Sequence, residues 1–370
     1  MISNSVPRST VIKPGTILPQ QTHTRLESIH QYAILNMDAK YASAWEVQRG
    51  PGDNRPTGLE VIKDNDLMGK LADKVIFITG CSSGIGIETA RALSATGAKL
   101  FLTSRNLEKA RLALGDILEP GRVHLLQLDL ESLDSVRDCV KQFHSMSNSL
   151  NILINNAGVR YTPKGRTKDG FEIQFGTNHV AHFLLFQLLK PTLLASSMPD
   201  FNSRVVALAS TAHRESRINF DDLNMEKRGY NYATAYAQSK LANVYMANEI
   251  ERRYGSEGLH AWSVHPGGIR TGLQRFNFMD LAMILKVGIM NAKMTLQSPE
   301  QGCSTTVWAA VSKTLEGKGG KYLERCRISV PSKKGYALID PGHALHAYNE
   351  EDAKLLWQVT NRLVGLKDED

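Results

Sequence analysis

The stretch VIFITGCSSGIG, at residues 75–86, decides the fold. Its first five residues are apolar or β-branched and predict a short buried strand. Gly80, Gly84 and Gly86 follow with the spacing Gly-x3-Gly-x-Gly, and Glu88–Ala95 continues with a helical period. Such glycines let a backbone turn tightly and approach a phosphate, and the start of a helix offers free N–H groups at the positive end of its dipole. The stretch therefore predicts a strand–turn–helix unit that binds a nucleotide. The alternative is a tight turn without a ligand.

The same alternation of apolar strands and helical stretches continues along the chain. Continuous apolar strands indicate burial on both faces, and their alternation with helices is typical of a doubly wound parallel α/β fold. Further strands are predicted at Lys99–Thr103, Val123–Leu128, Asn151–Ile154, Arg204–Ala209 and His260–Val264, and further helices at Ser135–Phe143, Phe183–Leu194, Leu241–Arg253 and Glu351–Val364.

The first 70 residues differ from this pattern, so we expect an N-terminal extension, partly disordered, before a domain at residues 71–370. Residues 1–26 contain three basic residues and no acid, as in a mitochondrial presequence. Their three prolines oppose the amphipathic helix of such a presequence, which favours a plain disordered tail. Met37 is an alternative start. Residues 49–57 (RGPGDNRPT) have the glycine and proline content of a linker.

The composition is that of a globular protein, with 42% hydrophobic and 22% charged residues among 370. The four cysteines include no CxxC pair, so we expect no disulfide scaffold and no metal site. A cytoplasmic protein is favoured, with a mitochondrial location or peripheral membrane attachment as alternatives. The net charge of +7 comes from scattered basic residues, so no nucleic-acid partner is expected. No apolar run reaches the roughly 20 residues of an integral membrane span.

Polar residues follow the second and third predicted strands. Ser104 and Arg105 stand where a dinucleotide site often has an acid for the ribose 2′-hydroxyl. The guanidinium fork of an arginine suits a 2′-phosphate instead. Asp129 and Leu130 follow the third strand and are placed to contact an adenine ring. The alternatives are an ordinary surface arginine and a carboxylate that caps the next helix.

Three later groups are candidates for the reaction itself. Asn155–Gly158 (NNAG) is a small amide-rich turn that lets the backbone pass close to a ribose. Ser210 ends the fifth strand, where its hydroxyl can hold a substrate oxygen, and no Gly-x-Ser-x-Gly elbow marks it as a hydrolase nucleophile. Tyr236 and Lys240 share one face of a predicted helix. An ammonium beside a phenol lowers the phenol pKa from about 10 towards neutral, which makes tyrosine a usable general acid.

In this order, TGCSSGIG, NNAG, Ser210 and Tyr236-x3-Lys240 resemble the short-chain dehydrogenase/reductase family. The resemblance covers about residues 70–366. Details such as LTSRNLEKA, FGTNHVAHF and SVHPGGIRT are similar to its retinol-dehydrogenase-like branch, including fungal members. It implies a single Rossmann-like domain with about seven parallel strands. The chain departs from the family pattern at Cys81 in the glycine loop, at Ala181, and in its N-terminal extension.

The resemblance also implies roles for individual residues. Tyr236 would donate the proton in carbonyl reduction, Lys240 would lower the pKa of Tyr236 and bind the nicotinamide ribose, and Ser210 would orient the carbonyl. Asn178 would anchor a water that relays protons to Lys240, although an interior asparagine that holds a helix bend is the alternative. The predicted catalytic residues are Ser210, Tyr236, Lys240 and Asn178. The predicted cofactor-binding residues are Gly80, Ser82, Ser83, Gly84, Ile85, Gly86, Ser104, Arg105, Asp129, Leu130, Asn156, Ala157, Gly158, Tyr236, Lys240, Ile269 and Thr271.

The resulting expectation is an NADP(H)-dependent oxidoreductase that interconverts a carbonyl and an alcohol on a lipophilic small molecule, with a role in secondary metabolism. Apolar residues after Thr271 are expected to cover that substrate: Phe276, Phe278, Leu281, Met283, Ile284 and Leu285. The alternative is a non-catalytic NADP(H)-binding sensor or scaffold, which would not need Ser210, Tyr236 and Lys240. A sugar-nucleotide epimerase would show a different glycine spacing. The family also implies a homo-oligomer through the helices around residues 171–197 and 232–255.

Overall fold

A computed structural model describes Met1 and residues 39–269, 293–333, 335, 337 and 339–367. Asp38–Asp370 form one compact unit. Several expectations lie outside the described residues: the nature of residues 1–26, the contact of Thr271 with a nicotinamide, and the apolar cover at residues 276–285. No helix in the described ranges has both the length and the apolar character needed to cross a lipid bilayer.

The centre of this unit is an eight-stranded sheet with the strand order β10-β9-β6-β5-β4-β1-β2-β3. Seven strands run parallel, and only β10 pairs antiparallel, with β9. The predicted doubly wound Rossmann-like sheet is thus confirmed. The strands are β1 Val75–Ile78, β2 Lys99–Ser104, β3 Val123–Gln127, β4 Ile152–Asn155, β5 Ser203–Leu208, β6 Leu259–His265, β9 Lys321–Glu324 and β10 Arg327–Ile328.

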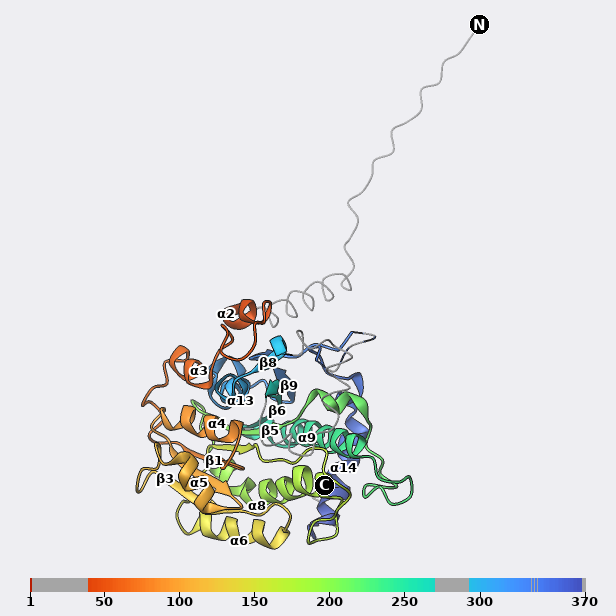
Figure 1. Cartoon of the computed structure of the whole chain (residues 1–370), viewed down its shortest axis with the longest axis horizontal. Helices are drawn as coiled ribbons and strands as arrows, with labels where there is room; N and C mark the ends of the chain where they lie inside the picture. The colour runs from red at the N-terminus through yellow and green to blue at the C-terminus, as the bar shows by residue number, and fades with distance from the viewer. Residues whose placement is uncertain (2–38, 270–292, 334, 336, 338, 368–370) are drawn as a thin grey trace. The chain divides into compact units, whose positions relative to one another are not determined.

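Side chains of each strand alternate between two apolar clusters, one on each face of the sheet. In β1, Val75 and Phe77 join one cluster, and Ile76 and Ile78 join the other. Figure 1 shows α4 and α13 on one side of the sheet and α6 and α8 on the other. The principal helices are α4 Ile85–Ser94, α5 Leu107–Leu114, α6 Leu133–His144, α8 Ala181–Ala195, α9 Tyr232–Tyr254, α13 Ser304–Val311 and α14 Glu350–Leu363.

Shorter elements connect these helices and strands. They are the helices α7 Ile173–Phe175 and α12 Pro299–Gly302, the π-helical turn η2 Gly176–Val180, and the 3-10 turns η3 Thr211–Glu215, η4 Gly255–Glu257, η6 Lys313–Leu315 and η7 Leu345–Tyr348. Two further strands, β7 Gly268–Ile269 and β8 Leu296–Gln297, form a separate parallel pair. This pair lies after β6, on the two sides of residues 270–292 in the sequence.

Residues before the first sheet strand pack onto the same unit. They form α2 Ala39–Ala42, η1 Ser43–Trp45 and α3 Gly58–Asp64. A capping box between Thr57 and Glu60 starts α3, and Val61 and Ile62 are fully buried in the cluster that contains α13. Residues 49–57, expected as a linker, instead form a turn in which Arg55 has 1% exposure. The two glycines and two prolines of this segment form a bend, in which the Asp53 N–H donates to the Gly50 carbonyl.

Candidate active site

A cavity of about 730 Å³ opens at the carboxyl ends of the parallel strands. This is the edge of an α/β sheet where ligands usually bind, because the loops there diverge. The cavity brings together most of the predicted site: Gly80, Ser82, Ser83, Gly84, Ile85, Gly86, Ser104, Arg105, Asp129, Leu130, Asn156, Ala157, Gly158, Ser210, Tyr236, Lys240 and Ile269 all line it. Asn178 lies outside its wall, and Thr271 is outside the described residues.

The glycine turn after β1 has no room for a side chain at Gly80 or at Gly86. Gly80 has φ +77°, and a Cβ there would lie 2.8 Å from the Ala157 Cα. A Cβ at Gly86 would lie 2.3 Å from the Gly80 carbonyl oxygen and 2.6 Å from Asn156 Nδ2. These glycines are therefore required because the turn packs against the loop that follows β4.

The N-terminus of α4 faces the cavity with its backbone donors uncapped. Gly84, the residue before the helix, has φ +64° and provides no side-chain cap. Ser82, Ser83 and Ile85 line the cavity beside it. Uncapped N–H groups and the positive end of the helix dipole favour a phosphate at such a place. The residues present thus fit the pyrophosphate of a dinucleotide.

The far end of the cavity, beyond β2 and β3, is charged. Arg105 Nη1 donates to Glu131 Oε1 at 2.6 Å, and the Arg105 side chain is 54% exposed. The Ser104 hydroxyl is engaged in its own turn, because it donates to the Asn106 carbonyl at 2.9 Å. Asp129 accepts from the Glu131 N–H and lies 3.2 Å from Lys168 Nζ. The cap of α6 is Ser132, so the alternative in which Asp129 caps that helix does not apply.

The NNAG turn after β4 is tied to β1 by hydrogen bonds. Asn156 Nδ2 donates to the Thr79 carbonyl at 2.7 Å, and the Ala157 N–H donates to Thr79 Oγ1 at 2.9 Å. His182 Nε2 lies 2.9 Å from the same hydroxyl. Burial lowers the pKa of His182 to about 4, so its ring is neutral and one nitrogen can accept from Thr79. The network fixes the floor of the cavity.

Ser210, Tyr236 and Lys240 meet near the middle of the cavity, beyond β5. Ser210 and Tyr236 both line the cavity, and the Ser210 side chain acts to lower the pKa of the Tyr236 phenol. Lys240 Nζ lies 5.7 Å from the centre of the Tyr236 ring and donates to the Leu208 carbonyl at 2.9 Å. Both side chains come from α9, one helical turn apart, as the four-residue spacing predicts.

Burial dominates the ionisation of both groups. It raises the pKa of Tyr236, while the positive charge of Arg160 and the Ser210 side chain oppose that rise. Burial lowers the pKa of Lys240 to about 8. Arg160 is thus a charge that acts on the phenol here. The effect of Lys240 on the Tyr236 pKa stays a prediction.

Asn178 lies in the π-helical turn η2 and has no exposed surface. Its Oδ1 accepts from the Val159 N–H at 2.8 Å, and its Nδ2 donates to the Val159 carbonyl and to Ser239 Oγ at 3.0 and 2.9 Å. Its main-chain oxygen is 3.0 Å from His182 Nδ1. These bonds hold the loop after β4 and α9 together at an irregular turn. Its proposed water contact stays a prediction.

Sequence reasoning did not select several other residues of the cavity wall. Arg160 follows NNAG by two residues, and its Cζ lies 4.2 Å from the Tyr161 ring centre and 5.7 Å from that of Tyr236. Trp45 and Arg325 also line the cavity, on segments that the sequence pattern left unassigned. None belongs to a motif. The one available signal was the position of Arg160 directly after a predicted site loop.

The fold and the cavity define a class of protein. A doubly wound sheet with a dinucleotide cradle and a Ser–Tyr–Lys group in one cavity is typical of nicotinamide-dependent oxidoreductases. The sequence model of the short chain dehydrogenase family matches residues 74–281. The chain belongs to this short-chain dehydrogenase/reductase family and is an oxidoreductase, and the family binds a nicotinamide cofactor.

Relatives extend the similarity beyond the family match. The chain is 48% identical over 330 residues to "Short-chain dehydrogenase/reductase prx1" of Penicillium roqueforti, covering 89% of this chain and 96% of that protein. It is 37% identical over 298 residues to "Retinol dehydrogenase 13" of Homo sapiens, covering 80% of this chain and 85% of that protein. A crystal structure of an uncharacterized protein from Mycobacterium paratuberculosis, 30% identical, has a TM-score of 0.58 and covers 80% of this chain and 95% of that one. The resemblance to the family and to its retinol-dehydrogenase-like and fungal members is confirmed.

Proposed function

We propose that the protein interconverts a carbonyl and an alcohol on a lipophilic small molecule with NADP(H). The observation that carries this proposal is the placement of Ser210, Tyr236 and Lys240 in one cavity with the glycine turn and the N-terminus of α4. A bound nicotinamide supplies or accepts the hydride. The protein supplies orientation and a proton.

In the reducing direction, Ser210 holds the substrate oxygen and Tyr236 gives it a proton as hydride reaches the carbonyl carbon. The charge of Arg160 stabilises the phenolate that remains. Lys240, whose Nζ lies 5.7 Å from the centre of the ring, is proposed to add to this stabilisation. In the oxidising direction the phenolate takes the alcohol proton. Lys240, with a pKa of about 8, is mostly protonated at neutral pH and can carry this charge.

NADP(H) is favoured over NAD(H) by Arg105 and Lys109, which line the cavity beyond β2. A 2′-phosphate would compete with the Glu131 carboxylate for the Arg105 guanidinium. That ion pair is exposed and contributes little stability, so a doubly charged phosphate can displace it. Apolar lining residues, among them Val159, Ile269 and Leu296, favour a lipophilic substrate.

The experiment compares Tyr236→Phe with wild type in NADPH-dependent reduction of a panel of aldehydes, ketones and quinones. We expect Tyr236→Phe to lower kcat about 100- to 10,000-fold, because the proton donor is lost, while NADPH binding is retained. Tyr232→Phe, which removes a partly exposed phenol from the same helix, is the matched control and is expected to keep full activity.

Titrations of the wild-type protein with NADPH and NADH complete this experiment. Tighter binding of NADPH is expected. Equal or tighter binding of NADH would overturn the role of Arg105 in binding a 2′-phosphate. The proposed interconversion of a carbonyl and an alcohol would still stand. Binding of NADPH without turnover of any carbonyl compound would instead favour a sensor or scaffold.

A further inference from the structure

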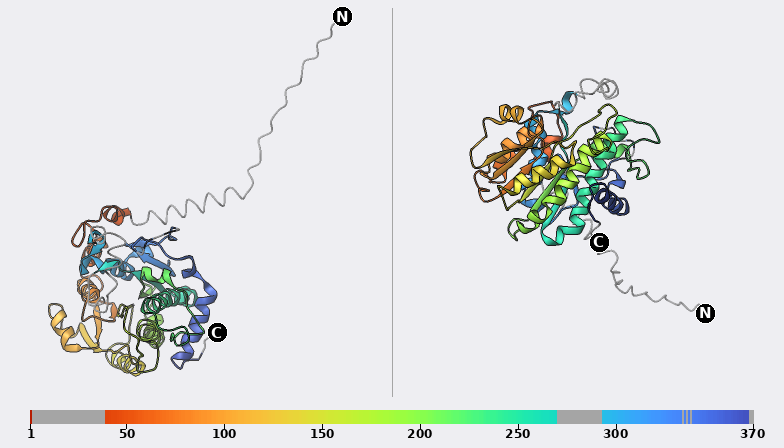
Figure 2. Two further views of the ribbon diagram at one scale, coloured as in Figure 1. Left: turned by 45° about the vertical axis from the view of Figure 1, so that its right-hand side comes forward. Right: turned by 90° about the horizontal axis from the view of Figure 1, so that it is seen from below.

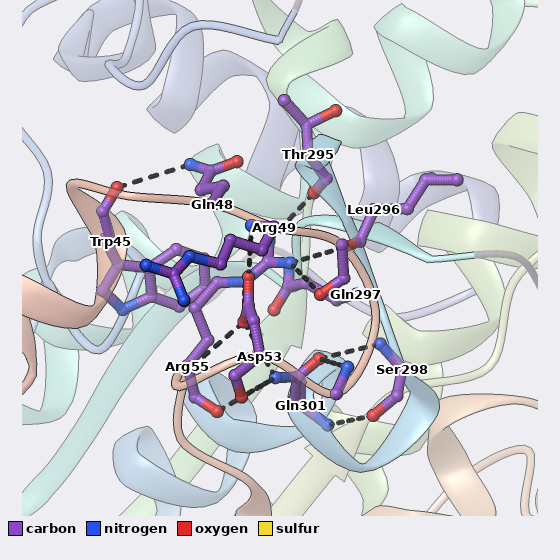
Figure 3. A network of polar contacts seen from close by, with 12 residues as sticks. Trp45, Gln48, Arg49, Asp53, Arg55, Thr295, Leu296, Gln297, Ser298 and Gln301 are labelled. Atoms are coloured by element: carbon purple, nitrogen blue, oxygen red, sulfur yellow. Dashed lines mark hydrogen bonds and ion pairs between the residues drawn. The ribbon is translucent and has the colours of Figure 1, made fainter. Parts of the chain in front are cut away.

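The N-terminal segment Trp45–Arg55, which precedes the family match at residues 74–281, is fastened to the cavity by a buried arginine. The Arg55 side chain is 1% exposed. Its Nε donates to Asp53 Oδ1 at 2.7 Å, and its Nη1 donates to the Thr295 carbonyl at 3.0 Å. Its Nη2 donates to the carbonyls of Gly50 and Leu296, at 3.0 and 2.5 Å. Figure 3 shows this guanidinium between the N-terminal turn and the chain that carries Thr295–Gln297.

Gln301 provides a second attachment between the same two parts of the chain. Its Nε2 donates to the carbonyls of Asp53 and Arg55 at 2.9 and 3.1 Å, and its Oε1 accepts from the Gly52 N–H at 2.9 Å. The side chain is 1% exposed. A buried arginine and a buried amide thus have nearly all their bonds to backbone groups of two segments about 240 residues apart. So many satisfied polar groups indicate that residues 50–55 are held in a fixed position against residues 295–301. We call this attachment, made by Arg55 and Gln301, the joint.

The joint positions Trp45 against a second arginine. Arg55 Cζ lies 5.6 Å from the centre of the Trp45 ring, and Arg325 Cζ lies 5.7 Å from it. Such distances are those of cation–π contacts. Trp45 and Arg325 both line the cavity, whereas Arg55 does not. The indole Nε1 of Trp45 is buried and has no hydrogen-bond partner among the described residues.

Arg325 has a backbone conformation with positive φ, which is unfavourable for arginine. Arg325 and Cys326 have φ of +55° and +52° in the tight turn between β9 and β10. Such turns favour Asn and Gly, which accept a positive φ at low cost. The Arg325 guanidinium is partly buried, and among the residues that the structure describes it forms no hydrogen bond or ion pair. A strained turn that directs donors into a cavity points to a ligand.

Strand order places Arg325 at the substrate end of the cavity. Arg105 follows β2, Ser210 follows β5 and Arg325 follows β9, and these strands lie in the order β9-β6-β5-β4-β1-β2. The reacting centre therefore separates Arg325 from the Arg105 end. The carboxylates of Glu324 and Asp340 and the guanidiniums of Arg327 and Arg55 all act on Arg325, so the charges at this end largely offset one another. A neutral acceptor oxygen suits it better than a carboxylate.

We propose that residues 45–55 form the outer wall of the substrate end, where the Arg55–Trp45–Arg325 stack presents a guanidinium to a neutral acceptor oxygen of the substrate, remote from its reacting carbonyl. The proposal rests on the proposed function for the position of the reacting carbonyl. Arg325 is its specificity-determining residue, and Arg55 is a positioning residue that acts through Trp45.

Binding to the NADP⁺-loaded protein tests the recognition without turnover. The probes are methyl 4-formylbenzoate, which carries a second acceptor oxygen, and 4-propylbenzaldehyde, which does not. We expect wild type to bind the ester about tenfold more tightly by calorimetry. Arg325→Met and Trp45→Leu should abolish this preference, and Trp45→Phe, which keeps an aromatic face, should restore it. Equal binding of the two probes by wild type would overturn the proposal.

Thiol labelling tests the joint without any substrate. Cys303 is fully buried beneath α3, where a Cβ on Gly58 would lie 2.5 Å from its Sγ. Arg55→Lys should speed labelling of Cys303 about tenfold and weaken ester binding by a similar factor, because the guanidinium fork to three carbonyls is lost. The control Arg91→Lys removes a comparable contact, to Asp116 and the Ala113 carbonyl, away from the cavity, and should change neither.

Unchanged labelling and unchanged ester preference in Arg55→Lys would refute the positioning role. Failure of the proposed function has a different signature, because an intact wild type would then reduce neither aldehyde with NADPH. The labelling rate would still test whether Arg55 holds residues 45–55 in place, and the calorimetric preference would still test whether Arg325 recognises the ester.

Discussion

Lys240 carries a buried ammonium, and its charge adds little to the stability of the folded protein. The side chain is 5% exposed, and burial lowers its pKa from 10.5 to about 8. At pH 7 this shift corresponds to about 3 kcal/mol of destabilisation. Its hydrogen bond to the Leu208 carbonyl offsets part of that cost. That carbonyl also accepts from Asn243 Nδ2 at 2.9 Å, so it keeps a partner when the ammonium is removed.

We therefore expect Lys240→Met to be more stable than wild type at pH 7, by about 1–2 kcal/mol, while turnover is lost. The unfolded chain binds more protons than the folded one between pH 8 and 10.5, so wild-type stability rises relative to the variant across that window. Thermal unfolding at pH 7 and pH 9.5 measures this. A variant that is less stable at pH 7, or a gap that widens with pH, would contradict the assignment.

At the scale of elements, the turn between β1 and α4 has a shape that only glycine fits. A Cβ on Gly86 would meet the Gly80 carbonyl and the Asn156 amide, and neither can move without disturbing the loop after β4. The same contacts bring two cofactor-binding loops together. A change here therefore affects stability and binding at once.

Gly86→Ala is expected to destabilise the protein by about 1–3 kcal/mol, as overpacking does, and to weaken NADPH binding at least tenfold. Gly165→Ala is the matched control, because its φ is not positive and its nearest neighbours would lie 3.8 Å from the new Cβ. Chemical denaturation and a fluorescence titration measure the two effects. Retained NADPH affinity in Gly86→Ala would show that the turn does not cradle the phosphate.

The sequence predicted the elements whose signals are local. Six sheet strands lie within one or two residues of their predicted positions, because each is a continuous apolar run between turn residues. The strand β9 Lys321–Glu324 was missed, since its four residues begin and end with charges and the pairing with β6 determines it. The helix α13 was missed for a similar reason: all its residues are buried, so it has no amphipathic period.

The site residues divide in the same way, into those with a local sequence signal and those that only tertiary packing brings together. Tyr236 and Lys240 were predicted together because their spacing is a property of one helix. Trp45, Arg160 and Arg325 come from three distant segments, and only tertiary packing brings their side chains to one cavity. The ion pair of Arg105 with Glu131 is likewise non-local, since it joins the ends of two strands.

At the scale of the whole molecule, α14 covers the helices through which the family is expected to assemble. Figure 2 shows α14, in dark blue, beside α9 in the view from below. Trp357 of α14 is 2% exposed and packs edge-on against Phe183 of α8, with ring centres 4.9 Å apart. Arg253 of α9 lies over the same indole, at 4.8 Å. Where Trp357 packs, the surfaces of α8 and α9 are not available to a second copy, and the predicted homo-oligomer stays a prediction.

The full chain is therefore expected to run as a monomer of 41.0 kDa in light scattering, and Trp357→Ala is expected to change that. Loss of the indole costs about 3–5 kcal/mol of stability and loosens α14, which exposes the apolar faces of α8 and α9. The variant should unfold at lower temperature and associate with rising concentration. Leu355→Ala, at a 39% exposed position of the same helix, should remain monomeric. A wild-type dimer whose mass is unchanged by Trp357→Ala would place the contact on another face and refute the covering role of α14.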